Sequence, residues 1–287
     1  MKRPDLIAGT MTWGVWGKDM NRNAMAQHIE GCMQQGVFAF DHADIYGDFT
    51  TERSFGAAFS ETDIAREDVW WISKCGIQYP NPQKAESVKH YNYSPAHIRK
   101  SVENSLRNLK TAYLDVLLLH RPSPLMDPEA ILQTLHQLRE EGKIKSWGVS
   151  NFTPSQMSLF QGDESPLWNQ LEFSVTRTEP MTDGTLDYMK ANQIGAMAWS
   201  PLGFFFKETN AQQERLKHVL VALSEKTGWT LAQLILAWLV RHPNGVIPVV
   251  GTTDLKRLSE LKKATSIQLE LEHWFAMTEA SWGHRVP

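Results

Sequence analysis

The chain alternates short apolar runs with longer amphipathic runs about eight times, and this alternation limits its possible folds more than any other feature. Such alternation is typical of repeated strand and helix units, in which successive strands run parallel and the helices cover them. We therefore expect eight strands, which lie at Leu6–Gly9, Phe38–Asp41, Val69–Lys74, Tyr113–His120, Lys145–Ser150, Pro166–Gln170, Gly195–Trp199 and Val246–Val250. Eight such units in 287 residues predict a closed (β/α)8 barrel of the TIM type, with one domain that spans residues 1–287.

Helix start and stop signals flank the amphipathic runs. Ser94, Asp127 and Thr153 each precede a proline, so a capping side chain stands just before a residue that suits the first helical turn. Gly36 and Gly142 follow two of the runs, where glycine can end a helix in the left-handed conformation. We expect helices at Asn23–Gln35, Thr51–Phe59, Ser94–Asn108, Asp127–Glu141, Pro154–Phe160, Thr185–Ala191, Arg215–Thr227, Leu231–Arg241 and Asp254–Lys263.

An open, doubly wound sheet is the alternative fold for a chain with this pattern. A dinucleotide-binding sheet of that kind carries a Gly-x-Gly-x-x-Gly turn after a strand. The glycines Gly9, Gly14 and Gly17 lack this spacing, and the sequence has no other such turn. The closed barrel is therefore the favoured prediction.

Charge and composition argue against several kinds of partner. The formal net charge is -3 and the basic residues are scattered, so we expect neither a nucleic acid nor an acidic membrane surface as a partner. No apolar run approaches membrane-spanning length, and the amino terminus lacks the apolar run of a secretory signal. Cys32 and Cys75 are too few for a disulfide scaffold. We expect a cytoplasmic protein that acts on a small molecule; its oligomeric state stays open, with a monomer as one alternative.

Polar residues end the predicted strands, and in a barrel these ends face one bowl. The stretch Phe38–Gly47, FAFDHADIYG, reads as a buried strand that presents an acid and, a tight loop later, a phenol. Any one of these polar residues is, taken alone, as well explained as a cap or a solvated loop residue. Together they predict a functional site. The set comprises Asp41, Tyr46, Lys74, His120, Ser150, Asn151, Gln170 and Trp199.

Four members of this set can reduce a carbonyl group together. A tyrosine has a reference pKa of about 10, and an adjacent ammonium lowers it by roughly 1–3 units, which makes a better acid at neutral pH. Lys74 can supply that charge to Tyr46 while Asp41 keeps Lys74 in place and protonated. His120 can orient the substrate oxygen or share in proton transfer. Side chains supply no hydride, so the set implies a nicotinamide cofactor.

The sequence is similar to the aldo-keto reductase superfamily of NADPH-dependent (β/α)8 oxidoreductases over nearly all of its length. FDHADIYG, ISKCG and LLLHRP resemble the segments that carry the family's catalytic tetrad. The resemblance assigns catalysis to Asp41, Tyr46, Lys74 and His120. It implies reduction of aldehydes or ketones to alcohols, with hydride from NADPH and a proton from Tyr46.

Other segments resemble the family's cofactor-binding stretches. GVSNFTP and WNQLEFS are similar to the stretches that bind the nicotinamide carboxamide, and AWSPLGFF to the one that stacks on the nicotinamide and lines the pyrophosphate. VIPVVGTTDLKRLSEL resembles the segment that grips the adenosine 2′-phosphate. The resemblance implies that three groups of residues bind the cofactor. In the order of these segments they are Ser150, Asn151 and Gln170; Trp199, Ser200, Leu202 and Gly203; and Gly251, Thr252, Thr253 and Arg257.

The sequence departs from the family pattern at two positions that bear on function. Many family members have threonine where this chain has His42, and many have lysine where it has Gly251. The second departure leaves the 2′-phosphate to Arg257 and the two threonines, so the preference for NADPH over NADH stays open. The stretch Gln78–Tyr93 is also longer than most strand-to-helix loops, and its tyrosines serve either a substrate pocket or a surface excursion.

Three further features leave alternatives. In Met11–Trp16, Trp13 and Trp16 either wall the substrate pocket or, for one of them, pack in the core. Phe204–Phe206 is a flap over the cofactor, the reading we favour, or an apolar patch for a partner. Asp41, His42 and Asp44 superficially suggest a metal site, but Lys74 would repel a cation, so we expect no metal.

The alternative to an enzyme is an NADPH-binding regulatory protein that keeps the reductase barrel.

Overall fold

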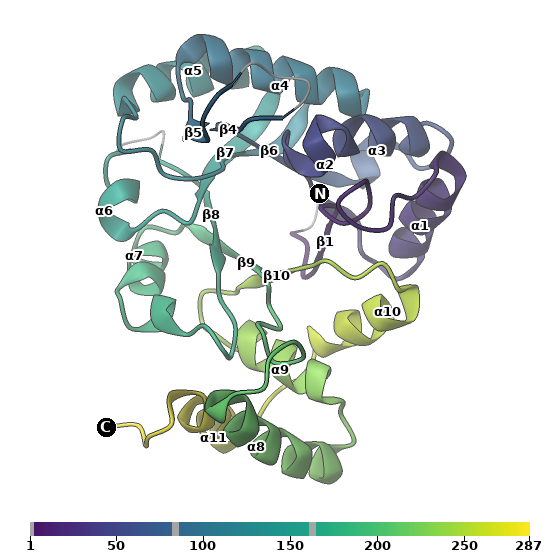
Figure 1. The fold of residues 1–287 in the computed structure, drawn as a ribbon. Coiled ribbons are helices and arrows are strands. Elements are labelled where there is room, and N and C mark those ends of the chain that lie inside the picture. The colour runs from purple at the N-terminus through teal and green to yellow at the C-terminus, as the bar shows by residue number, and fades with distance from the viewer. Residues whose placement is uncertain (1–2, 82–85, 161–164) are drawn as a thin grey trace.

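The computed structural model describes residues 3–81, 86–160 and 165–287, and its centre is a closed barrel of parallel strands (Figure 1). Going round the barrel, the strands follow the order β1, β10, β9, β8, β7, β6, β3 and β2. Their bounds are Ile7–Gly9 (β1), Ala39–Asp41 (β2), Trp70–Cys75 (β3), Leu114–Leu119 (β6), Ile144–Ser150 (β7), Trp168–Glu172 (β8), Gly195–Trp199 (β9) and Ile247–Val250 (β10). The predicted (β/α)8 barrel is confirmed.

The predicted strands overlap the observed ones, and their ends differ by one or two residues. The largest difference is at β8 (Trp168–Glu172), which starts and ends two residues later than the predicted Pro166–Gln170. Pro166 has no N–H to donate to a neighbouring strand, which disfavours it inside the sheet. Gln170 consequently lies within the strand, where it pairs with Ser150 of β7.

Helices surround the barrel and follow the predicted order. The side chains of Ser94, Asp127 and Thr153 each accept a hydrogen bond from a backbone N–H of the helix that follows, as predicted. The bounds are Arg22–Gln34 (α1), Tyr46–Phe49 (α2), Thr51–Phe59 (α3), Pro95–Leu109 (α4), Pro128–Glu140 (α5), Pro154–Met157 (α6), Thr185–Ala191 (α7), Ala211–Thr227 (α8), Leu231–Val240 (α9), Leu255–Ala264 (α10) and Leu271–Trp282 (α11). Among the described residues, no helix is long and apolar enough to cross a membrane.

Two helical predictions were wrong in extent, and two helices, α2 and α11, were not predicted. α6 ends at Met157 rather than Phe160, and α8 begins at Ala211 rather than Arg215 because Asn210 caps it by accepting from Gln213 N. No side chain caps the amino terminus of α11, so the start signal that marks most of the other helices is missing there.

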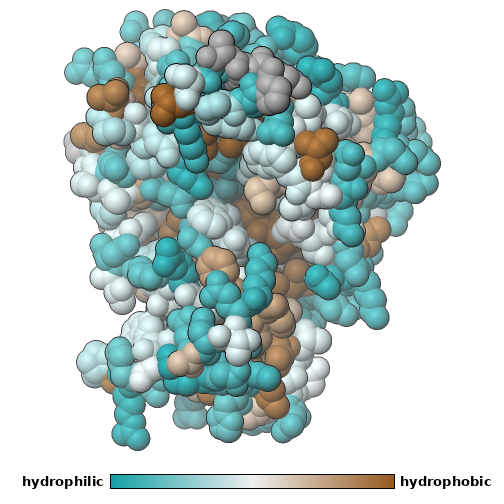
Figure 2. Space-filling view, viewed as in Figure 1, coloured by the Kyte–Doolittle hydropathy of each residue, from teal (hydrophilic) through white to brown (hydrophobic). Residues whose placement is uncertain are grey.

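The lower lobe in Figure 1 contains α8 and α11, which pack side by side outside the barrel. The side chain of Arg215 on α8 donates to Ala280 O on α11 at 2.9 Å, and Trp238 of α9 stacks on Trp274 of α11 with 5.4 Å between the ring centroids. Figure 2 shows that the face in view is hollowed between this lobe and the barrel, and that hydrophobic side chains gather in the hollow.

The barrel interior is filled by aliphatic side chains and closed at the end where the strands begin. Trp70 and Trp168 are the first residues of β3 and β8, and their rings meet edge to face at 5.3 Å. The guanidinium of Arg3 lies 5.3 Å from the Trp168 ring and donates to Gly245 O. The interior layer comprises Ile7, Ala39, Ile72, Val116, Leu118, Met197, Ile247 and Val249. A site inside the barrel can therefore open only at the ends of the strands.

Candidate active site

The four predicted catalytic residues meet at the carboxyl ends of β2, β3 and β6. Asp41 ends β2, Lys74 is the penultimate residue of β3, and His120 follows β6 directly. The Lys74 ammonium donates to Asp41 Oδ2 at 2.7 Å and to Tyr46 Oη at 3.0 Å, and its third bond, of 2.8 Å, goes to the carbonyl of His42. The rings of Tyr46 and His120 lie 6.2 Å apart. The structure thus brings together an acid, its charged neighbour and an imidazole.

The ion pair of Lys74 and Asp41 is almost completely withdrawn from water. The exposed fraction of Lys74 is 1% and that of Asp41 is 2%. A buried ion pair is tolerated when its remaining lone pairs and protons are also bonded. Lys74 uses all three of its N–H groups, and the second carboxylate oxygen of Asp41 accepts from Gln170 Nε2 at 2.8 Å. The pair is therefore fixed in one geometry.

Burial, rather than Lys74, dominates the proton affinity of Tyr46. Burial raises the pKa of the Tyr46 hydroxyl, and the Lys74 ammonium lowers it by less, so the net pKa lies above its ordinary value. Lys74 does lower the pKa of Tyr46, as predicted, but the rise caused by burial is larger. For Lys74 itself, burial lowers the pKa, while Asp41 and Tyr46 together raise it by more. At neutral pH the site therefore holds a charged ammonium beside a protonated phenol.

His120 is a neutral imidazole in this environment. Burial lowers its pKa well below the ordinary value, and the charges of Lys74 and Arg121 act in the same direction. Its buried Nδ1 has no hydrogen-bond partner among the described residues. A neutral imidazole offers one donor and one acceptor nitrogen. His120 thus has bonding capacity left for a substrate oxygen beside Tyr46.

Gln170 links two opposite sides of the barrel. It lies on β8, four strands away from β2 in the closed order, and yet its amide nitrogen reaches Asp41. A carboxylate can only accept hydrogen bonds, so the nitrogen of the amide must face Asp41, and Oε1 is left to accept from a donor elsewhere. The predicted partner of Gln170 was the nicotinamide carboxamide. In the structure its amide nitrogen bonds to Asp41, and its contact with the carboxamide stays a prediction.

The predicted nicotinamide residues of β7 and β9 form a hydrogen-bonded chain. Asn151 Nδ2 donates to Ser150 Oγ at 2.9 Å, and Trp199 Nε1 donates to Asn151 Oδ1 at 3.0 Å. Asn151 and Ser200 both have left-handed backbones, with φ of 59° and 49°. That conformation is uncommon for residues other than glycine and tends to persist where a functional site requires it.

The predicted pyrophosphate segment follows Trp199 in a tight turn. A Cβ on Gly203, whose φ is +57°, would lie 1.9 Å from Thr176 Oγ1, so no larger residue fits at this position. Leu202 is partly buried against the core. Phe205 is buried, whereas Phe204 and Phe206 expose 43% and 56% of their surfaces. The middle residue of the predicted flap thus anchors the segment, and its two neighbours face outward.

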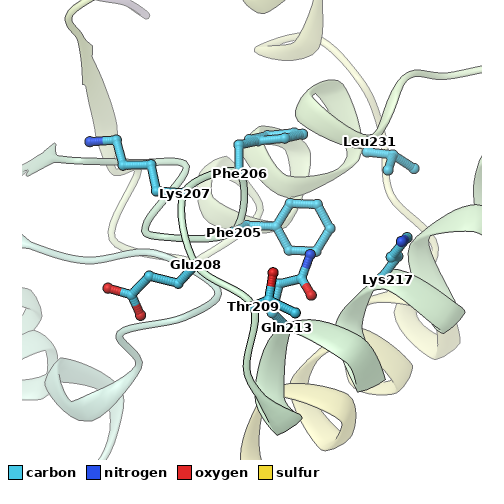
Figure 3. A pocket seen from close by; sticks show the side chains of 8 residues that line it. All are labelled: Phe205, Phe206, Lys207, Glu208, Thr209, Gln213, Lys217 and Leu231. Atoms are coloured by element: carbon cyan, nitrogen blue, oxygen red, sulfur yellow. The ribbon is translucent and has the colours of Figure 1, made fainter.

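Two cavities lie beside this segment rather than at the tetrad. The larger, of about 310 Å³, is enclosed by residues 205–209, by Gln213 and Lys217 of α8 and by Leu231 of α9, and the smaller, of about 160 Å³, adjoins it. In Figure 3 the Phe205 ring points toward Gln213, and Lys217 and Leu231 face it from the helices. Lys207 and Glu208 point to the other side of the loop.

The predicted 2′-phosphate segment is open to solvent. Asp254 caps α10 by accepting from the backbone N–H groups of Lys256 and Arg257, and Thr252 Oγ1 accepts from Asp254 N. Gly251 and Arg257 are exposed, and Thr253 is half-buried. Within the part of the chain that the structure describes, the Arg257 guanidinium makes no hydrogen bond or ion pair. The segment presents a free cation beside a rigid turn.

The two tryptophans after β1 have different places. Trp13 is fully buried, and its ring packs on Phe40 and Phe55, so it belongs to the core. Trp16 is 40% exposed, and its ring lies 6.2 Å from that of Tyr46. Of the two alternatives left open by the sequence, the structure therefore supports the one in which one of the two tryptophans, Trp13, packs in the core.

The long segment after β3 is tied to the site. It forms a two-stranded antiparallel sheet of β4 (Ile77–Gln78) and β5 (His90–Tyr91); residues 82–85 of the predicted stretch lie outside the described residues. Tyr79 donates to Asp48 at 2.7 Å and stacks on Phe49. Tyr93 is buried and donates to Arg121 O at 2.6 Å. These contacts fix two tyrosines close to α2 and β6.

His42, where the sequence departs from the family pattern, is buried behind the tetrad. Its Nδ1 lies 3.0 Å from Thr10 Oγ1, and its ring packs edge to face on Phe55. Burial lowers the pKa of His42 to about 3, and Lys74 contributes to the shift. Among the described residues, no cluster of three histidine, cysteine or acidic side chains could hold a metal ion.

Sequence reasoning missed one polar residue of the bowl, Arg121. Its Nη1 donates to His120 O at 2.8 Å and to Ser150 Oγ at 3.2 Å, and its guanidinium carbon lies 5.9 Å from the centre of the Trp199 ring. The signal was available in LLLHRP, because a residue directly after a strand-end histidine also faces the mouth of the barrel.

These features define a barrel protein with a buried chain of hydrogen bonds from Asp41 through Lys74 to Tyr46, and comparison with known proteins identifies its family. A model of the aldo/keto reductase family matches residues 5–281. The chain belongs to this family. It is 40% identical over 265 residues to the oxidoreductase YcsN of Bacillus subtilis, covering 90% of this chain and 88% of that protein. It is 34% identical over 283 residues to a 6-dehydroglucose reductase of Agrobacterium fabrum, covering 96% and 95%.

Solved structures agree with the fold. The aldo-keto reductase Tm1743, determined with the inhibitor epalrestat, superposes with a TM-score of 0.82 at 27% identity, covering 97% of this chain and 95% of that one. An aldo-keto reductase of Bombyx mori in complex with NADP superposes with a TM-score of 0.76 at 22% identity, covering 97% and 89%. The family and its oxidoreductase relatives make the chain an oxidoreductase.

Proposed function

We propose that the protein reduces aldehyde or ketone carbonyls to alcohols with NADPH, and that Tyr46 donates the proton. The observation that carries this proposal is the buried chain of hydrogen bonds from Asp41 through Lys74 to Tyr46, which ends beside a neutral His120. Family membership supports the oxidoreductase class. The substrate is a small carbonyl compound.

Each tetrad residue has a separate task in this proposal. Tyr46 passes its proton to the carbonyl oxygen as the carbonyl carbon is reduced, and the ammonium of Lys74 stabilises the phenolate that is left. Asp41 keeps Lys74 charged and positioned. His120 orients the carbonyl oxygen with a neutral nitrogen. Water then returns a proton to Tyr46, so that the product alcohol leaves with one hydride and one proton added.

A bound nicotinamide would supply the hydride that no side chain can supply. The residues available for it fit in chemistry: Gln170 Oε1 can accept from an amide, Trp199 is half-buried with a ring that can stack, and Arg257 is a free cation that suits a phosphate. We assign the cofactor to Ser150, Asn151, Gln170, Trp199, Ser200, Leu202, Gly203, Gly251, Thr252, Thr253 and Arg257. Arg257 would confer the preference for NADPH.

The same proposal covers the rest of the molecule. The chain acts as one domain over residues 1–287, in a reducing, cytoplasmic setting that suits its two free, buried cysteines, Cys32 and Cys75. The exposed Phe204 and Phe206 flank the predicted pyrophosphate segment, which favours a flap over the cofactor.

The test is an assay of NADPH oxidation across a panel of aldehydes, ketones and dicarbonyls. The panel includes an activated nitrobenzaldehyde and the 6-aldehyde of glucose, because a relative is named for that substrate. We expect turnover with at least one aldehyde and none with Tyr46→Phe. A protein that binds NADPH but oxidises it with no member of the panel would instead be the regulatory alternative.

A further inference from the structure

Half of the Arg121 guanidinium has no partner in the bowl. Nη1 makes both of its side-chain hydrogen bonds, to His120 O and Ser150 Oγ. Nη2 and Nε make none within residues 3–81, 86–160 and 165–287, and no carboxylate of these residues forms an ion pair with Arg121. The side chain is half-buried between His120 and the Trp199 ring. Its open edge therefore carries unused donors beside the catalytic imidazole.

The position of Arg121 is fixed by the backbone around it. The hydroxyl of Tyr93 donates to Arg121 O at 2.6 Å and accepts from Arg121 N at 3.0 Å. Tyr93 is itself buried against Gly76, where a Cβ would lie 2.2 Å from the tyrosine ring. A surface arginine usually moves freely, but this one is held at its main chain by a core residue and at its side chain by two acceptors.

The positive charge of Arg121 has no ion-pair partner among the described residues. Asp41 and Lys74 form an ion pair with each other, and Tyr46 and His120 are neutral at ordinary pH, so none of these four groups balances the guanidinium. Lys89 also acts on His120 from the segment after β3, since its charge lowers the pKa of that imidazole. An arginine without a counterion at the mouth of a catalytic site suits a ligand with acceptor oxygens.

We propose that Arg121 is a specificity-determining residue that binds acceptor oxygens on the far end of the carbonyl substrate. The preferred substrates are accordingly aldehydes that carry a carboxylate or vicinal hydroxyl groups a few bonds from the carbonyl. A carboxylate takes the open edge of the guanidinium as a bidentate partner and also balances its charge, whereas hydroxyl groups accept without neutralising it. This inference rests on the proposed reductase function and adds the substrate class.

The test compares matched aldehydes in the wild type, Arg121→Gln and Arg121→Lys. One pair is 4-carboxybenzaldehyde and its methyl ester, and the other is glyceraldehyde and propanal. We expect the wild type to favour 4-carboxybenzaldehyde over its methyl ester, or glyceraldehyde over propanal, or both. The ratio of kcat/KM values should be about tenfold to a hundredfold, as for one charged hydrogen bond. Glutamine keeps a donor but no charge, and lysine keeps the charge but not the fork.

The substrate preferences that each variant loses identify the oxygen-bearing group at the far end of the substrate, its tail. If the tail is a carboxylate, Arg121→Gln loses the preference for the acid and Arg121→Lys keeps part of it. If the tail is hydroxylated, Arg121→Gln keeps part of the preference for glyceraldehyde. The control is Arg99→Gln, because Arg99 is bonded to Glu141 on the outside of the barrel, and its removal should leave both ratios unchanged.

Three results would overturn the inference: ratios near one in the wild type, ratios that Arg121→Gln does not change, or a loss explained entirely by weaker NADPH binding. The dissociation constant of NADPH, measured for each variant by tryptophan fluorescence, separates the last case. If no aldehyde is reduced, the reductase proposal fails, and titration calorimetry with 4-(hydroxymethyl)benzoate and its methyl ester still decides the role of Arg121. Equal affinities in the wild type and Arg121→Gln would then reject it.

Discussion

The tetrad and the predicted 2′-phosphate segment differ in almost every physical respect. Lys74 and Asp41 are buried at strand ends, and all three N–H groups of Lys74 are bonded inside the protein. Arg257 lies at the start of a surface helix, exposed and unpaired among the described residues. The ion pair of the first region is fully bonded within the protein. The second region has donors that no described group of the protein accepts from.

The contrast indicates that the two regions suit different tasks. A buried, fully bonded charge is held in one geometry, which suits a group that must place a proton within a fraction of an ångström. An exposed cation costs little to leave unpaired and can exchange a diffusing phosphate rapidly. Mutations in the first region should consequently affect the chemical step, and mutations in the second should affect cofactor affinity.

The largest expected effect is that of Lys74→Met. It removes the charge that stabilises the Tyr46 phenolate, so the rate of reduction should fall at least as far as in Tyr46→Phe. It also leaves Asp41 buried without its ion, which costs about 3–5 kcal/mol of unfolding free energy. The alkaline limb of the pH–rate profile should disappear, because the pKa of Tyr46 rises further once Lys74 is gone. Urea denaturation and a pH–rate profile measure these changes.

A double variant separates stability from catalysis. Asp41→Asn combined with Lys74→Met removes both charges and should recover much of the lost stability without recovering activity. Retention of the wild-type rate and pH profile in Lys74→Met would show that Lys74 and Tyr46 are not coupled.

Tyr46→Phe should lower the rate of the chemical step by about 10²–10⁴-fold, the usual value of general acid catalysis. NADPH affinity should stay close to that of the wild type, because the hydroxyl bonds to Lys74 and not to a predicted cofactor residue. Single-turnover kinetics and fluorescence titration measure the two quantities. More than about a tenth of wild-type turnover in the chemical step would exclude Tyr46 as the acid.

Arg257→Ala should raise the NADPH dissociation constant about tenfold to a hundredfold and change NADH binding little, since a charged hydrogen bond contributes roughly 1.5–3 kcal/mol. The matched control is Lys256→Ala, which removes a neighbouring exposed cation and should have little effect. Titration of both cofactors into both variants by tryptophan fluorescence decides between them. Equal losses for NADPH and NADH in Arg257→Ala would place the 2′-phosphate elsewhere.

The smallest effect concerns stability alone. His42 has a folded pKa of about 3 and, like any histidine, an unfolded pKa of about 6.5, so the unfolded chain binds more protons between these values. Its contribution to stability is present above about pH 6.5 and is lost as the pH falls through that window, by up to about 1.4 kcal/mol per pH unit.

The variant His42→Thr lacks this contribution, so its unfolding free energy should depend less on pH than that of the wild type. This holds whatever the difference in unfolding free energy between the two proteins at neutral pH. Urea titrations between about pH 4 and pH 6.5 test it. His218→Gln, which removes an exposed histidine of α8, is the control and should leave the slope unchanged. An unchanged slope in His42→Thr would mean that His42 is protonated in the folded protein.

Most of the barrel was predictable because each strand is a local apolar run that begins and ends with recognisable residues. Lys74 and His120 could be assigned to the site for the same reason, since each follows such a run. The bond between Gln170 and Asp41 was not predictable, because it depends on which strands lie opposite once the barrel closes. The places of Trp13 and Trp16 could not be decided from the sequence, because a pattern of aromatic residues does not state toward which side a loop turns them.

The bond between Gln170 and Asp41 has a consequence for the biosynthesis of the protein. All four tetrad side chains lie within the part of the chain that ends at His120, whereas the amide that holds Asp41 comes from β8. A nascent chain made only as far as β7 carries the whole catalytic set but has two unpaired sheet edges and no strand facing Asp41. Asp41 therefore gains its second partner only when the barrel closes, and we expect a chain truncated before β8 to lack a fixed pair of Asp41 and Lys74.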